Sequence, residues 1–190
     1  MNEHLHRKDL KFMRFSVSVL LVSVIFICSG CLSKRPRTEE DLLRLAFEAL
    51  KERQWEQYSR LIITRADFFL YEDNISEFEE PNSYLGSVIK PEQIEMHKNL
   101  FFRSIQGGQN YIHFEQTEFC RPGTLLKSET KKLIEKDPVI LNTYSLVITD
   151  GNTEFDTKEL YPHFTVAYVP WMGQYRILEL ELPPIAKTDP

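Results

Sequence analysis

The sequence predicts an α+β domain in which N-terminal helices pack on one face of an antiparallel sheet. Two observations on the 190-residue chain predict this arrangement. Between residues 38 and 106, apolar side chains recur every three or four positions, which is typical of amphipathic helices. Between residues 111 and 182, runs rich in Val, Ile, Tyr, Phe and Thr follow one another, which is typical of strands. Helices and strands in separate blocks favour an α+β layout.

The first helix is predicted to begin after Thr38. The Thr38 hydroxyl suits an N-cap, and the acids at positions 39–41 suit the positive end of the helix dipole. After a polar break at residues 51–54, Trp55 opens a second apolar series, interpreted as another helix or a bent continuation that ends near Leu70. The stripe of the first helix consists of Leu42, Leu43, Leu45, Ala46, Phe47, Ala49 and Leu50.

A third helix is predicted to open at Pro91, because proline at the first helical position loses no hydrogen bond. The acidic run 71–81 before it has no periodicity and is interpreted as a loop. Gly107 and Gly108 are predicted to end the helix. One side of it carries Ile94, His97, Phe101 and Ile105.

Strands are predicted over residues 111–120, 140–149, 164–169 and 174–182. Residues 170–173 are predicted to join the last two strands as a hairpin, and Pro183 and Pro184 to end the sheet before a tail over 183–190. One domain over residues 38–182 follows. In the last strand, strict alternation predicts Arg176, Leu178, Leu180 and Leu182 on one face, opposite Tyr175, Ile177, Glu179 and Glu181.

Residues 15–31, FSVSVLLVSVIFICSGC, resemble the signal peptide of a bacterial lipoprotein. Basic residues precede an uncharged apolar core, and the small residues Ser29 and Gly30 lead into Cys31. The resemblance implies that residues 1–30 are removed, that Cys31 carries the lipid that binds the membrane, and that residues 31–37 form a short tether. It also implies an exported protein, and Leu32 in place of Asp favours the outer membrane of a two-membrane bacterium. The alternative is an uncleaved transmembrane helix over residues 15–32, which is short for a span of about 20 residues.

The charge of the chain argues against nucleic-acid binding. Residues 1–30 carry 4 Lys or Arg and 2 Asp or Glu, which leaves 19 basic and 26 acidic residues in the mature chain. An acidic surface repels phosphate backbones.

Because Cys28 would be removed and Cys31 lipidated, only Cys120 remains, so no internal disulfide is expected. We expect Cys120 to be a small buried residue.

The element order and the segments EALKERQWEQYSRLI and GQYRILEL are similar to the nuclear transport factor 2-like superfamily, with a cystatin-like helix on a sheet as the alternative. The resemblance implies a curved sheet that forms a cone, and in enzymes of this type an Asp or His inside it. By that analogy His97 and His113 are candidate pocket residues, with Tyr111 or Tyr144 as hydroxyl donors. The alternative, which we favour, is that His97 packs between helix and sheet, beside no acid and no deep pocket, and that His113 faces solvent.

No cofactor or metal is expected. The histidines lack an HExxH spacing, and the alternating acids from Asp150 to Asp156 depart from a calcium loop, so Asp150-Gly151 is interpreted as a turn.

Trp171 and Met172 at the hairpin tip either form an exposed contact or fold back under the sheet.

We expect a non-enzymatic, membrane-tethered module that binds an envelope protein or a small apolar ligand. The alternatives are an acid–base enzyme of the same fold and a structural envelope protein.

Overall fold

The computed structural model describes residues 35–69, 89–132 and 138–184. The chain divides into two compact units, Met1–Arg35 and Pro36–Pro190, and the description below concerns the second. The signal-like segment with Cys31, the acidic run 71–81 and residues 185–190 of the tail lie outside the described residues.

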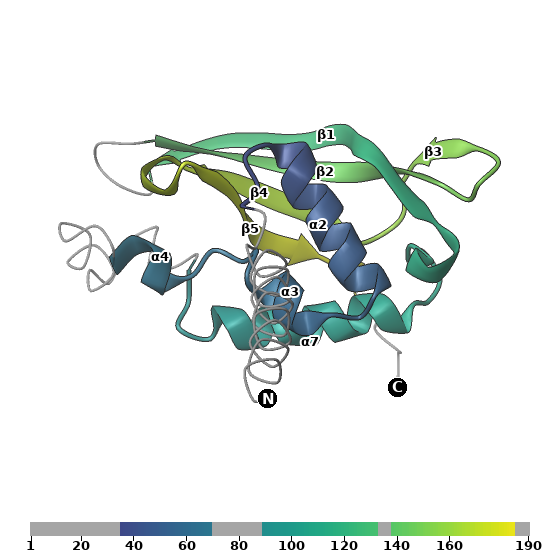
Figure 1. Cartoon of the computed structure of the whole chain (residues 1–190), viewed down its shortest axis with the longest axis horizontal. Coiled ribbons are helices and arrows are strands. Elements are labelled where there is room, and N and C mark those ends of the chain that lie inside the picture. The colour runs from purple at the N-terminus through teal and green to yellow at the C-terminus, as the bar shows by residue number, and fades with distance from the viewer. Residues whose placement is uncertain (1–34, 70–88, 133–137, 185–190) are drawn as a thin grey trace, which may run out of the picture. The chain divides into compact units, whose positions relative to one another are not determined.

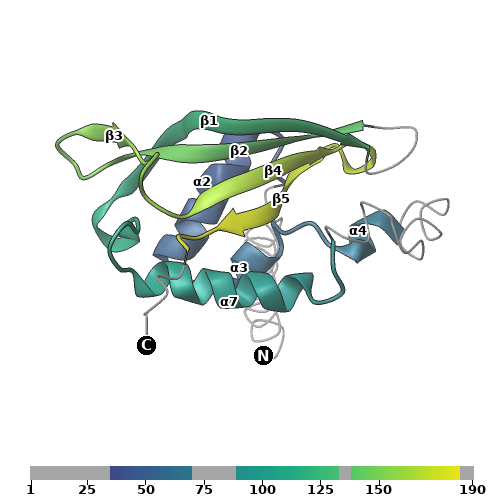
Figure 2. The same cartoon turned by 180° about the vertical axis from the view of Figure 1, so that it is seen from behind.

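The second unit has the predicted α+β fold, with helices packed against a curved antiparallel sheet. Its five strands follow the order β1 (Glu118–Lys132), β2 (Pro138–Thr149), β4 (His163–Val169) and β5 (Gln174–Glu181), while the short β3 (Glu154–Asp156) pairs with β2. Helix α2 (Glu39–Lys51) crosses one face of the sheet, and α7 (Gln93–Gln106) runs beside the β5 edge (Figure 1). Figure 2 shows the same arrangement from behind.

The first predicted helix is confirmed. Thr38 has extended backbone angles, and its Oγ1 accepts a hydrogen bond from the Asp41 N–H at 3.0 Å, so it is the N-cap of α2. The apolar face of the helix lies against the sheet. Its fully buried side chains are Leu42, Leu43, Ala46, Phe47, Ala49 and Leu50.

The second predicted helix is wrong in its length. It is divided into two short helices, α3 (Trp55–Ser59) and α4 (Arg65–Phe69). Between them the chain is extended beside β5, where the Ile177 N–H donates to the Leu61 carbonyl and the Ile63 N–H donates to the Ile177 carbonyl, both at 2.8 Å. The segment thereby provides hydrogen-bond partners for the backbone N–H and C=O of Ile177 at the outer edge of β5. The β-branched side chains of Ile62 and Ile63 favour the extended conformation.

Helix α7 begins at Gln93, two positions after the predicted start, because Pro91 and Glu92 form a turn before it. Gly107 ends it with a φ of +74°. The buried stripe is also rotated from the predicted one, since Ile94 is 38% exposed. The buried side chains of α7 are Gln93, His97, Phe101 and Ser104.

The first predicted strand is displaced along the chain. Residues 114–116 form a 3₁₀ turn, Tyr111 makes an isolated bridge with Tyr161, and β1 starts only at Glu118. The rest of β1 is mostly polar and contains Pro122 and Gly123, residue types that usually favour a turn. An edge strand accepts both, and the pairing of β1 with β2 shifts in register around them.

The other three predicted strands and the hairpin are confirmed, but the faces of β5 are not as predicted. Gly173 closes the hairpin in the left-handed conformation, with φ +60°. Further along, Val166 pairs with Ile177 while Thr165 pairs with Glu179, so Leu178 is an extra residue in a β-bulge. The bulge breaks the strict alternation, and Leu178 and Leu180 therefore join different buried clusters.

Buried apolar side chains form two clusters. The first lies between the sheet and α2, α3 and α7, and includes Phe47, Phe101 and Phe164. The second consists of Ile63, Ile89, Val139, Leu141, Ala167, Val169 and Leu178, whose strand positions alternate with those of the first. Trp171 packs against the second cluster, and its indole N–H donates to the Asp67 carbonyl at 2.8 Å. Trp171 is thus folded back onto the domain.

Candidate functional site

The candidate site is a groove of about 330 Å³ between α7 and β5. Helix α7 and the residue Lys90 before it form one wall, and residues 178–181 of β5 form the other. The groove opens to solvent, and Met96, one of its lining residues, is 41% exposed. Apolar side chains line much of it, namely Met96, Leu100, Leu178 and Leu180.

His97 lies in this groove beside β5, held by a backbone carbonyl. Gln93 and His97 are one helical turn apart, and both reach the Leu178 carbonyl oxygen, at 2.8 Å from Gln93 Nε2 and 3.0 Å from His97 Nε2. The two side-chain nitrogens are 3.2 Å apart. Since Leu178 is the bulged residue of β5, its carbonyl is available to the helix rather than to a neighbouring strand.

His97 is neutral at pH 7. Burial lowers its pKa to about 4, and the hydrogen bond with the Leu178 carbonyl opposes that effect only in part. The side chain is 2% exposed, and Nδ1 is buried without a hydrogen-bond partner in the described part of the chain. As predicted, His97 packs between the third helix and the sheet, with no described carboxylate or second histidine within hydrogen-bond distance. It lines an open groove rather than an enclosed cavity.

Charged groups form the rim of the groove. Burial raises the pKa of Glu179, and repulsion from Glu181 raises it further. His163 approaches the same rim, with Nδ1 4.0 Å from Glu181 Oε2. Lys90 is exposed on the opposite wall. Among the described residues, the arrangement is that of an apolar binding groove with carboxylates along one side and the Lys90 amine on the other.

The structure does not bring the four predicted pocket residues together. His113 lines a different and more polar groove of about 230 Å³, at the C-terminal ends of α2 and α7. Tyr111 bridges to Tyr161, and neither Tyr111 nor Tyr144 lines either of these two grooves. The Tyr144 hydroxyl donates to Glu39 at 2.6 Å, and burial together with this bond raises the pKa of Tyr144.

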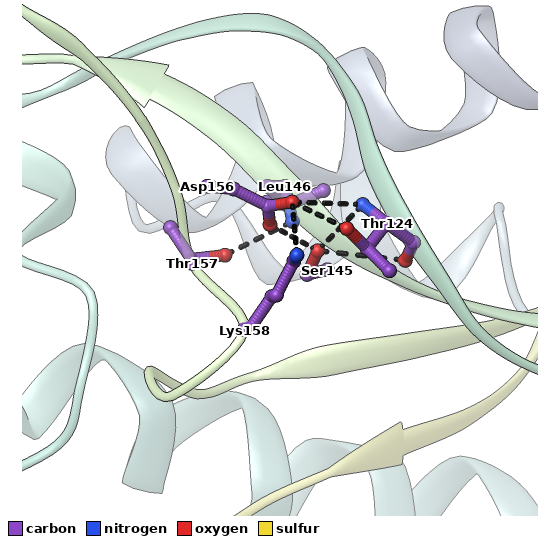
Figure 3. Close-up of polar contacts among 6 residues, drawn as sticks. All are labelled: Thr124, Ser145, Leu146, Asp156, Thr157 and Lys158. Atoms are coloured by element: carbon purple, nitrogen blue, oxygen red, sulfur yellow. Dashed lines mark hydrogen bonds and ion pairs between the residues drawn. The ribbon is translucent and has the colours of Figure 1, made fainter.

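A polar cluster that the sequence analysis missed joins strands β1, β2 and β3 (Figure 3). The Asp156 carboxylate of β3 accepts hydrogen bonds from the Ser145 hydroxyl of β2 and, at 2.6 Å, from the Thr124 hydroxyl of β1. Lys158 lies 3.9 Å from it. Burial opposes ionisation of Asp156, but these hydrogen bonds outweigh it and lower the pKa. Because these bonds join three neighbouring strands, we assign the cluster to stability.

The remaining candidates for chemistry have local structural roles. Asp150 Oδ1 accepts the N–H groups of Asn152 and Thr153 at 2.9 and 3.0 Å, which confirms the predicted turn and lowers the pKa of Asp150. Cys120 is half-buried rather than buried. Within the described ranges, no group of three His, Cys, Asp or Glu side chains is arranged to hold a metal ion.

Two further findings bear on function. None of the helices formed by the described residues has both the length and the apolar character needed to cross a membrane. A comparison of this chain with protein-family models, with curated proteins and with solved structures finds no match.

Proposed function

We propose that this protein is a membrane-tethered lipoprotein of the bacterial cell envelope, acylated on Cys31, whose domain is a non-enzymatic binding module. The lipid anchor rests on the sequence, in which an apolar core and Ser29-Gly30 precede Cys31. Leu32 after the cysteine favours delivery to the outer membrane of a two-membrane bacterium. The order of the helical segments α2, α3, α4 and α7, followed by long antiparallel strands, supports a nuclear transport factor 2-like domain.

The observation that carries the binding function is the α7–β5 groove with His97 neutral inside it. A general acid or base works best with a pKa near the operating pH and within hydrogen-bond reach of the substrate. His97 has a pKa of about 4, and its Nε2 is engaged by Gln93 and the Leu178 carbonyl. This arrangement favours holding a ligand over transferring its protons.

The chemistry of the groove suits an apolar occupant, either a small ligand or a side chain of an envelope protein. Leu100, Leu178 and Leu180 offer apolar surface, and the exposed Met96 is unbranched and adapts to irregular shapes. Lys90 and Glu179 would orient polar ends at the rim.

The lipid anchor is tested by growing bacteria that express the full chain with an alkyne-bearing fatty acid and detecting label on the protein. We expect wild type to be labelled and to fractionate with membranes, and Cys31→Ser to lose the label. Cys28→Ser and Cys120→Ser are matched controls that should keep it. Label that persists in Cys31→Ser, or unlabelled wild type, would contradict the lipoprotein proposal.

The groove is tested in the same cells with a photoreactive amino acid placed at Met96. The matched control places it at Phe155 on β3, a site of similar exposure, at 37% against 41% for Met96. We expect a discrete cross-linked species from position 96 and none from position 155, and we expect substitution of Leu100 by Asp to suppress it. Equal cross-linking at both positions, or none at position 96, would exclude the groove as the binding site.

A further inference from the structure

One row of the sheet, on the face that carries α2, is not covered by any of the described helices or loops. Ile140 is 54% exposed and Tyr168 is 39% exposed, while Tyr175 is half-buried. Tyr168 and Tyr175 are a cross-strand pair with ring centroids 5.1 Å apart. Leu141 pairs with Ala167, so one step further in this antiparallel register brings Ile140 beside Tyr168. We call Ile140, Tyr168 and Tyr175 the tyrosine row.

The row is exposed because α2 begins short of it. The Glu39 carboxylate, in the first turn of α2, accepts hydrogen bonds from Asn142 Nδ2 at 2.8 Å and from the Tyr144 hydroxyl at 2.6 Å. On this face of β4, the residues beneath α2 are buried, with Phe164 0% and Val166 1% exposed. The next residue on the same face, Tyr168, is the one that opens to solvent.

The polypeptide enters the domain at this row. The Tyr175 N–H donates to the Pro36 carbonyl at 3.0 Å, and Pro36 itself is buried, so the chain is fixed to β5 at that point. Figure 1 shows the start of the coloured chain passing β5 and β4 before it becomes α2. Cys31 is five residues before Pro36, and five residues span at most about 18 Å when fully extended.

We propose that the tyrosine row is the surface by which the domain rests on the phospholipid bilayer that holds the Cys31 lipid. This inference rests on the proposed lipidation of Cys31, because the short tether then keeps Tyr175 within about 20 Å of the bilayer. Tyrosine rings prefer the membrane interface, where the apolar ring and the polar hydroxyl both find suitable surroundings. Arg37, exposed in the segment that precedes α2, adds attraction to anionic headgroups.

The small size of the row favours the bilayer over a protein as its occupant. Three side chains are far fewer than the roughly 20 to 30 residues that each partner contributes to a stable protein–protein interface. A weak contact is enough when a covalent anchor already keeps the two surfaces together, because the anchor supplies a high effective concentration. The tether gives the bilayer that advantage and gives none to a partner that is not itself held at the membrane.

The test uses the mature lipidated protein reconstituted into vesicles of phosphatidylethanolamine and phosphatidylglycerol that contain brominated lipid. Ile140→Trp and Tyr168→Trp each place a reporter in the row, and wild type supplies the background of Trp55 and Trp171. Phe155→Trp is the matched control, since Phe155 is also on this face of the sheet but pairs with Ile148, eight residues along β2 from Ile140. We expect the reporters at 140 and 168 to lose most of their fluorescence and the reporter at 155 to lose little.

The outcomes separate this inference from the proposed function. Protein that does not float with vesicles refutes the lipid anchor, and this inference with it. Protein that floats but shows equal quenching at positions 155 and 168 keeps the anchor and refutes the contact of the row with the bilayer. Shielding of position 168 from aqueous acrylamide in native membranes, without quenching by brominated lipid, would identify a protein on the row and also overturn the inference.

Discussion

His97 is a buried base whose ionisation opposes folding. Its pKa is about 4 in the folded protein, against an ordinary value of 6.5, so between these values the unfolded chain binds more protons than the folded one. The neutral ring therefore contributes stability that is complete above pH 6.5 and is lost as the pH falls towards 4.

The prediction compares wild type with His97→Gln, in which the amide can still donate to the Leu178 carbonyl. We expect the free energy of unfolding of wild type to fall by roughly 2 to 4 kcal/mol more than that of His97→Gln between pH 7 and pH 4, since one pKa unit is about 1.4 kcal/mol. Urea denaturation at a series of pH values measures it. Parallel pH profiles for the two proteins would mean that His97 titrates normally.

Asp156 allows a second prediction at the same scale. Its carboxylate accepts from Ser145, from the Thr124 hydroxyl and, at 3.2 Å, from the Thr124 N–H, whereas Glu154 in the same strand only faces Arg121 at 3.5 Å on the surface. Asp156→Ala should lower the free energy of unfolding by about 1.5 to 3 kcal/mol. Glu154→Ala should lower it by less than about 1 kcal/mol. Equal losses in chemical denaturation would contradict the role given to the cluster.

At the scale of single elements, α3 is a short helix held by its contacts rather than by its own propensity. Five residues are too few for a helix that is stable alone. Trp55 opens it at the margin of the first cluster, with its ring centroid 5.5 Å from that of Phe101 and 6.0 Å from that of Tyr58. The packing of the Trp55 indole against Phe101 therefore holds α3 against α7.

We predict that Trp55→Ala lowers the free energy of unfolding by roughly 2 to 3 kcal/mol, below the usual cost for a fully buried tryptophan because Trp55 is half-buried. The matched control is Phe155→Ala, an aromatic residue that is 37% exposed on β3. It should cost clearly less. Thermal and urea unfolding measure both variants, and a Trp55→Ala protein as stable as wild type would refute this placement of the side chain.

At the scale of the whole domain, strand β5 joins the two buried clusters. Leu178 is 1% exposed in the second cluster and Leu180 is 3% exposed in the first, two residues apart in one strand. Because both clusters depend on the same strand, we expect them to unfold together in one cooperative transition.

The corresponding prediction concerns Leu178→Ala and Leu180→Ala. Each should lower the free energy of unfolding by about 2 to 4 kcal/mol without changing the denaturant m-value. Leu125→Ala is the control, because Leu125 is 48% exposed on β1 and should cost little. Tryptophan fluorescence and far-ultraviolet circular dichroism should give coincident curves for all of them. Separate transitions in Leu178→Ala would show that the second cluster is an independent unit.

The sequence by itself determined the elements whose signals are local. Thr38 and the acids after it mark the start of α2, Gly107 marks the end of α7, and Pro170 to Gly173 mark the hairpin, because capping and turn geometry depend on neighbouring residues. Alternation and β-branched residues were enough for β2 and β4. The order of these elements then predicted the α+β class, which the structure confirms.

Only the tertiary structure decided the features that depend on residues far apart in the chain. The edge of β5 draws Leu61–Ile63 out of the predicted helix, and β1 follows β2 despite Pro122 and Gly123. The groove has the same origin. It depends on the bulge at Leu178, which turns one carbonyl to His97 across 81 positions of sequence. The periodicity of apolar residues shows which face of a segment can be buried. It does not show which backbone N–H and C=O groups find partners in distant segments, and such long-range pairing leaves the Leu178 carbonyl free to bond with the side chains of α7.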